Sequence, residues 1–130
     1  MYPSRTLTVS IACDPRRVYA FVSNPENLPT WAQGLCRSVR KSETGWIVET
    51  PQGPMAIRFA PENDLGVVDH FVSPAPGTEV YVPMRVVPNG SGSAVLVTLF
   101  RLPDMSDEQY AEDARLVERD LETLKTVLER

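Results

Sequence analysis

The sequence ends in SDEQYAEDARLVERDLETLKTVLER (residues 106–130), which has the pattern of one long amphipathic helix. Its apolar residues recur at steps of three and four, so they share one helix face: Tyr110, Ala114, Val117, Leu121, Leu124 and Leu128. Ser106 and Gln109 have the spacing of a capping box, which predicts that the helix begins at Asp107. From there to Leu128 the helix is expected to be ~33 Å long, and its apolar face needs a cover of similar length.

Almost everything upstream of this helix reads as short strands separated by turn residues. The predicted strands are Thr6–Ile11, Ser38–Lys41, Trp46–Thr50, Met55–Phe59, Val67–Val72, Glu79–Val87 and Ala94–Arg101. The connections are too short for parallel crossovers, so we expect an antiparallel meander of about seven strands. Pro83 lies inside one of them and cannot donate a ladder hydrogen bond, which predicts an edge or a bulge there.

Two short helices are expected after the first strand. Asp14-Pro15 and Asn24-Pro25 each place a capping side chain before a proline, which is typical of a helix start. The second helix should run toward Trp31 and end before Gly34. The predicted fold class is therefore α+β: one domain, residues 1–130, in which a curved antiparallel sheet grips the long C-terminal helix.

Composition excludes several kinds of function. The net charge is −4 with mixed signs, which gives no reason to expect a nucleic-acid partner. The longest apolar runs are strand-sized, so we expect no stable membrane insertion, and without a signal-peptide core we expect a cytoplasmic protein. Cys13 and Cys36 are expected to be reduced. One histidine and no paired ligand motif predict neither a metal site nor a cofactor. The protein is expected to be a monomer or a homodimer.

The segment IACDPRRVYAFVSNPENLPTW (residues 11–31) resembles the opening of START-like proteins, the polyketide cyclase / Bet v 1-like (SRPBCC) superfamily. The order of the predicted elements resembles that superfamily over essentially the whole chain. The resemblance implies a helix-grip fold with a hydrophobic cavity between the sheet and the long helix. Members include lipid and sterol carriers, quinone-binding proteins, aromatase/cyclases and regulators of a chaperone. The superfamily shares no common catalytic residue, so none is carried over to this chain.

Alternation along the strands predicts which side chains face the long helix. In Trp46–Thr50, Met55–Phe59 and Val80–Val86 one face is apolar and the other carries the charges, and charges belong on the side open to water. Seven side chains are candidates for binding a ligand inside: Trp31, Trp46, Met55, Phe59, His70, Met84 and Tyr110. Ordinary core packing is the alternative for each apolar one. Charged residues such as Glu49, Arg58, Asp69 and Arg85 should face outward.

His70 is the one ionisable side chain expected on the apolar face. Burial should lower its pKa. It is either a polar contact or a proton-transfer group for a ligand, or a neutral core histidine bonded to the backbone or to a hydroxyl such as Thr98 or Tyr110.

Three functions follow from these patterns. The first is binding of a hydrophobic or aromatic small molecule, lipid-like or polyketide-like, in the cavity. The second is an enzyme, a cyclase, dehydratase or hydrolase in which His70 transfers a proton. The third is a regulatory module that binds another protein through the exposed sheet face or the helix surface. The sequence leaves open whether the chain is an enzyme.

Overall fold

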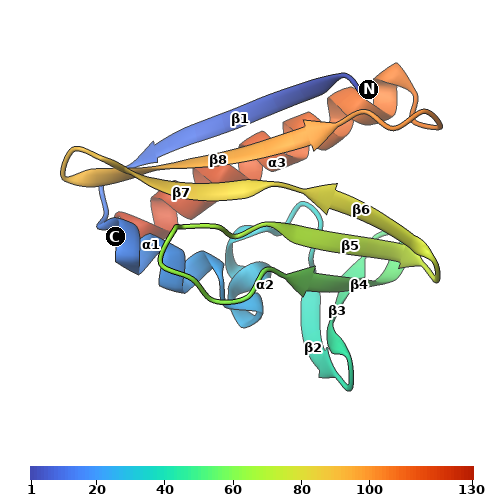
Figure 1. The fold of residues 1–130 in the computed structure, drawn as a ribbon, viewed down its shortest axis with the longest axis horizontal. Coiled ribbons are helices and arrows are strands. Elements are labelled where there is room, and N and C mark those ends of the chain that lie inside the picture. The colour runs from blue at the N-terminus through green and yellow to red at the C-terminus, as the bar shows by residue number, and fades with distance from the viewer.

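The structure is a computed structural model that describes all 130 residues, and the elements follow the predicted order (Figure 1). They are β1 (Ser4–Ile11), α1 (Pro15–Val22), the 3-10 helix η1 (Pro25–Asn27), α2 (Leu28–Trp31), β2 (Ser38–Ser42), β3 (Gly45–Thr50), β4 (Gly53–Phe59), β5 (His70–Ala75), β6 (Thr78–Val82), β7 (Met84–Asn89), β8 (Gly92–Phe100) and α3 (Asp107–Leu128). The predicted α+β class and helix-grip arrangement are confirmed. No helix has the length and apolar character needed to cross a bilayer.

Helices α1 and α3 begin directly after their predicted capping residues, Asp14 and Ser106. The hydroxyl of Ser106 accepts a hydrogen bond from the amide of Gln109 at 3.0 Å, and the carboxylate of Asp14 accepts one from the amide of Arg16 at 2.8 Å. The reciprocal half of the predicted capping box does not form. Instead, the side chain of Gln109 donates to Asp113, one turn further along, at 2.8 Å.

The sheet is antiparallel throughout but divides into two hydrogen-bonded ladders. One has the order β1-β8-β7 and the other β2-β3-β4-β5-β6. The division falls at Pro83, which splits the predicted strand Glu79–Val87 and raises the strand count from seven to eight. Pro83 has no amide hydrogen to donate, while its carbonyl accepts from the amide of Thr98 at 3.0 Å. The predicted edge or bulge is thus a change from one ladder to the other.

The predicted strand Val67–Val72 also starts later, at His70. Val67 forms only an isolated bridge with Arg85, and the amide of Val68 donates to the carbonyl of Met84 at 2.9 Å. These residues therefore pair with β7 of one ladder before the chain enters β5 of the other. This short crossing segment ties the two ladders together.

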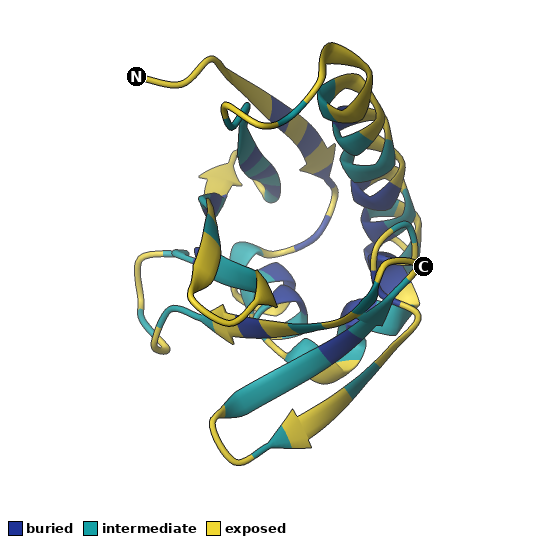
Figure 2. Cartoon of the chain, turned by 90° about the vertical axis from the view of Figure 1, so that its right-hand side faces the viewer, coloured by how far each residue is buried: buried dark blue, intermediate teal, exposed yellow.

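Packing is uneven across the molecule. Seven of the inward-facing side chains of β1, β7 and β8 are at most 7% exposed: Leu7, Val9, Ile11, Met84, Val86, Val95 and Val97. The long helix α3 makes its principal contacts with β1 and α2. Figure 2 shows buried residues along β1 and along one side of α3. The tightly packed core therefore lies where β1, β7 and β8 pack with α3, and the inner face of β3–β6 is less completely buried.

Candidate ligand-binding site

Strand register brings the predicted inward residues of the second ladder onto one face. Trp46 lies opposite Ile57 and Ile57 opposite Val72, while His70 lies between Phe59 and Val82. Directly opposed residues of an antiparallel pair point to the same side of the sheet. Ile57 belongs to the buried core together with residues of α3, so this is the side that faces the helix. The predicted alternation is confirmed.

We call five of these side chains the concave apolar face: Trp46, Met55, Phe59, Val72 and Val82. Each packs against the core yet is only partly buried. Their counterparts at the β1 side are almost fully covered. The protein therefore presents, on the inner side of its sheet, a row of apolar and aromatic side chains whose surface its own chain does not finish covering.

His70 lies on this face at the start of β5, between Phe59 at the end of β4 and Val82 at the end of β6. Its ring centroid is 5.2 Å from that of Phe59, and its Nδ1 is 3.1 Å from the carbonyl oxygen of Val68. Burial lowers the pKa of His70, and the hydrogen bond to Val68 and the charge of Asp69 offset this only in part. The expected pKa direction is confirmed. The partner is a backbone carbonyl, and the suggested hydroxyls bond elsewhere: Thr98 to Thr6, and Tyr110 to a carbonyl of β8.

The other candidate side chains fall into two groups. Trp31 and Met84 are 7% and 1% exposed and lie within the tightly packed core. The indole N–H of Trp31 is buried with no hydrogen-bond acceptor in the chain. Tyr110 is half-buried near the start of α3, where its hydroxyl donates to the carbonyl of Leu99 at 2.8 Å. These three belong to α2, β7 and α3, whereas Trp46, Met55, Phe59 and His70 belong to the strands of the concave apolar face.

Sequence reasoning missed a buried carboxyl group on α3. Asp120 is 3% exposed, and its Oδ1 accepts a hydrogen bond from the amide of Gly34, just after α2, at 3.1 Å. Burial raises the pKa of Asp120 to about 6, although the Gly34 amide and the charge of Arg119 lower it. Asp113 lies two turns earlier on the same flank, and burial raises its pKa too. The opposite flank is the one that contacts β1, through Lys125.

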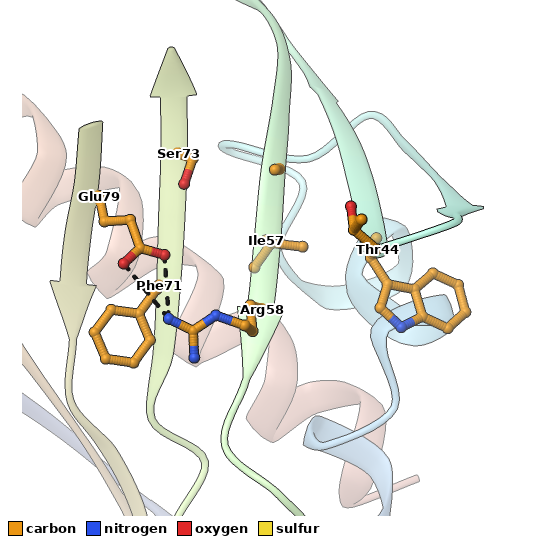
Figure 3. Close-up of a pocket in the computed structure, with 8 residues that line it drawn as sticks. Thr44, Ile57, Arg58, Phe71, Ser73 and Glu79 are labelled. Atoms are coloured by element: carbon orange, nitrogen blue, oxygen red, sulfur yellow. Dashed lines mark hydrogen bonds and ion pairs between the residues drawn. The ribbon is translucent and has the colours of Figure 1, made fainter. Parts of the chain in front are cut away.

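The outer face of the sheet carries a separate groove. A groove of about 130 Å³ lies over β3, β4 and β5, with Thr44, Ala56, Arg58, Phe71, Ser73 and Glu79 on its walls and with edges of Trp46 and Ile57. The guanidinium of Arg58 lies 4.4 Å from the centre of the Phe71 ring and pairs with Glu79 at 3.1 Å (Figure 3). Arg58 thus faces outward as predicted, and Trp46 borders both faces.

Asp69 is outward-facing, as predicted, but it is buried rather than solvated. Its carboxylate accepts three hydrogen bonds: from the Tyr81 hydroxyl at 2.9 Å, the Met84 amide at 2.9 Å and Arg85 at 2.8 Å. The group lies where the chain passes between the two ladders. Its role is to hold β5, β6 and β7 together behind the concave apolar face.

Comparison with known proteins agrees with this architecture. No family model matches the chain, and no curated protein does. Among solved structures, XoxI from Bacillus cereus superposes with a TM-score of 0.77 at 21% identity, over 96% of this chain and 94% of that one. A START superfamily protein from Mycobacterium smegmatis gives a TM-score of 0.70 at 16% identity, over 97% of both chains. Ara h 8.0201 gives 0.75 at 12% identity, over 98% of both.

A fourth similar structure is DynU16, a putative protein of the dynemicin biosynthetic locus, at a TM-score of 0.74 and 14% identity; the match covers 97% of this chain and 47% of that chain. At these identities the similarity establishes the fold. The chain has the helix-grip fold of START-like proteins, and the resemblance inferred from residues 11–31 is confirmed at that level.

Proposed function

We propose that this protein binds a hydrophobic or aromatic small molecule between the sheet and α3. The observation that carries the proposal is the concave apolar face: its five inward side chains on β3–β6 keep exposed apolar surface, while seven inward side chains of β1, β7 and β8 are at most 7% exposed. Uncovered apolar area facing inward costs free energy, and a ligand that removes it from water recovers about 25 cal/mol per Å². Such apolar sites with a few polar groups are typical of small-molecule binding.

The fold supports the same proposal. START-like proteins typically use the space between sheet and long helix for hydrophobic ligands, and the M. smegmatis neighbour is described as a START superfamily protein. The contacts of His70 also fit a binding protein more simply than they fit an enzyme. Its one hydrogen bond within the chain goes to a backbone carbonyl, and proton transfer in enzymes usually relies on a base held by a second side chain.

The proposal is tested by titrating the protein with N-phenyl-1-naphthylamine, a neutral aromatic probe whose fluorescence rises in apolar surroundings. A ligand of this size should bind with a dissociation constant on the order of 10 μM. Met55→Trp should weaken binding at least tenfold, because the indole would occupy space on the concave apolar face.

Ala56→Trp is the matched control. Ala56 is the next residue of β4, is exposed, and points to the opposite side of the sheet. It receives the same side chain outside the proposed site, so its binding should equal that of the wild type. Equal affinity of all three proteins for the probe, or weakened binding in Ala56→Trp alone, would place the probe elsewhere and overturn the proposal.

A further inference from the structure

We propose that the ligand is a flat, uncharged molecule with a hydroxyl hydrogen-bond donor, a phenol or a similar hydroxylated aromatic, and that this hydroxyl donates to Nε2 of His70. The inference rests on the proposed function, because it specifies the ligand of the same site. Three features of the interior support it: the free nitrogen of His70, the side chains around that nitrogen, and the charges that a ligand would meet.

The hydrogen bond of His70 fixes which ring nitrogen can accept. Nδ1 lies 3.1 Å from the carbonyl oxygen of Val68, and a carbonyl can only accept, so Nδ1 carries the proton. A neutral imidazole has one proton, so Nε2 presents a lone pair. Nε2 makes no hydrogen bond within the chain and is not among the fully buried unpaired atoms, so it reaches accessible space. His70 therefore offers an incoming ligand one hydrogen-bond acceptor.

The surroundings of Nε2 favour a flat aromatic body. Phe59 lies beside the imidazole with an interplanar angle of 41°, and Val72 and Val82 follow on the same face. Aromatic rings gain from offset or tilted contacts beyond the area that they bury. Met55, two same-face positions from Phe59 along β4, supplies a flexible thioether that adapts to ring edges.

The charges around the interior disfavour a carboxylate such as a fatty acid. The inward side chains of β4, β5 and β6 include no arginine or lysine to pair with one. A carboxylate on this face would lose its hydration without gaining a cationic partner, which is unfavourable. A neutral hydroxyl avoids that cost and still satisfies Nε2.

The experiment compares 2-naphthol with 2-methoxynaphthalene by isothermal titration calorimetry at pH 7. The two share the ring system, but only the naphthol can donate a hydrogen bond. Wild-type protein should bind 2-naphthol roughly five- to tenfold more tightly, as one neutral hydrogen bond allows. His70→Phe should remove the preference while still binding the methyl ether. His70→Gln, whose amide oxygen can accept, should restore part of the preference. Circular dichroism melts verify that both variants fold.

Each outcome separates the inference from the proposed function. Equal binding of both compounds to the wild type overturns the inference and leaves the hydrophobic site standing. A naphthol preference that survives in His70→Phe also overturns it, because another acceptor must then serve. Binding of neither compound overturns the inference and the proposed function together. Tighter binding of naphthalene-2-carboxylate than of 2-naphthol would contradict the charge argument and overturn the choice of ligand class.

Discussion

Asp69→Ala should be the most damaging substitution of a charged residue in this protein. Asp69 is 9% exposed, and its carboxylate is the acceptor for Tyr81, Met84 and Arg85 at 2.8–2.9 Å. It lies at the crossing between the two ladders of the sheet. Alanine would leave the Met84 amide buried without an acceptor and release the other two side chains.

The expected loss follows from these three contacts. An unpaired buried amide costs about 1–3 kcal/mol, and the Tyr81 hydroxyl bond contributes about 1 kcal/mol. The Arg85 side chain is 44% exposed, so solvent screening limits its ion pair to less than about 1 kcal/mol. The sum is about 3 kcal/mol. For 130 residues this corresponds to a fall in melting temperature of about 10 °C.

The difference in the free energy of unfolding between the wild type and Asp69→Ala should disappear at acid pH. Burial alone would raise the pKa of Asp69, but hydrogen bonds from Met84 and Tyr81 and the charge of Arg85 outweigh it and lower the pKa. A carboxyl whose pKa is depressed by folding stabilises the protein above its unfolded pKa of about 3.9, and this stability is lost as pH falls through the folded value. The difference in the free energy of unfolding between the wild type and the variant should therefore be largest at pH 7 and become smaller below about pH 4.

Urea unfolding followed by circular dichroism measures these quantities at both pH values. Glu79→Ala is the control: its ion pair with Arg58 is at least half exposed on both sides, so it should cost less than about 1 kcal/mol. A loss below about 1 kcal/mol in Asp69→Ala, or a loss equal to that of Glu79→Ala, would refute the role assigned to the buried carboxylate.

Three further substitutions test other parts of the structure by thermal unfolding. Asp120→Asn should stabilise the protein by about 2 kcal/mol at pH 8 and have little effect at pH 4. The reason is that folding raises the pKa of this carboxyl group to about 6, so its ionisation reduces stability as the pH rises from about 4 to about 6. Equal effects at both pH values would contradict this. Gly66→Ala should cost several kcal/mol, since its Cβ would clash with the carbonyl oxygen of Val86. Gly77 has a positive φ as Gly66 does, but its Cβ would meet no atom within 4 Å, so Gly77→Ala should cost only about 1–2 kcal/mol; similar losses would refute the steric argument. Ser106→Ala should cost about 1 kcal/mol through the lost cap, and no change would show that the cap contributes nothing.

The regular parts of the fold could be predicted because their signals are local. The three-and-four spacing of α3 and the alternation of the strands follow from backbone geometry, and both are realised. The sequence predicted an irregularity at Pro83, because proline lacks an amide hydrogen to donate. It did not predict that the chain passes there from one hydrogen-bonded ladder to the other. That outcome depends on Thr98, on a distant strand, which donates to the Pro83 carbonyl.

The candidate site was only partly predictable for the same reason. Alternation places His70 and Phe59 on one face, but their pairing depends on register between β4 and β5. Asp120 was missed because Glu118, Arg119 and Glu122 beside it are charged and its helix position borders the apolar stripe. Only the packing of α2 against α3 buries it beside Gly34. Likewise, the contact between the Arg58 guanidinium and the Phe71 ring could not be predicted, because it depends on how β4 and β5 pair.

The most direct test is to locate a bound aromatic ligand by methyl NMR, with N-phenyl-1-naphthylamine added to protein labelled at methionine, valine and alanine methyl groups. Intermolecular nuclear Overhauser effects should reach the methyls of Met55, Val72 and Val82, on the inner side of the sheet. The methyl of Ala56, which lines the outer groove, should show none. Contacts to Ala56 without contacts to those three, or no contacts at all, would contradict a hydrophobic site between sheet and helix.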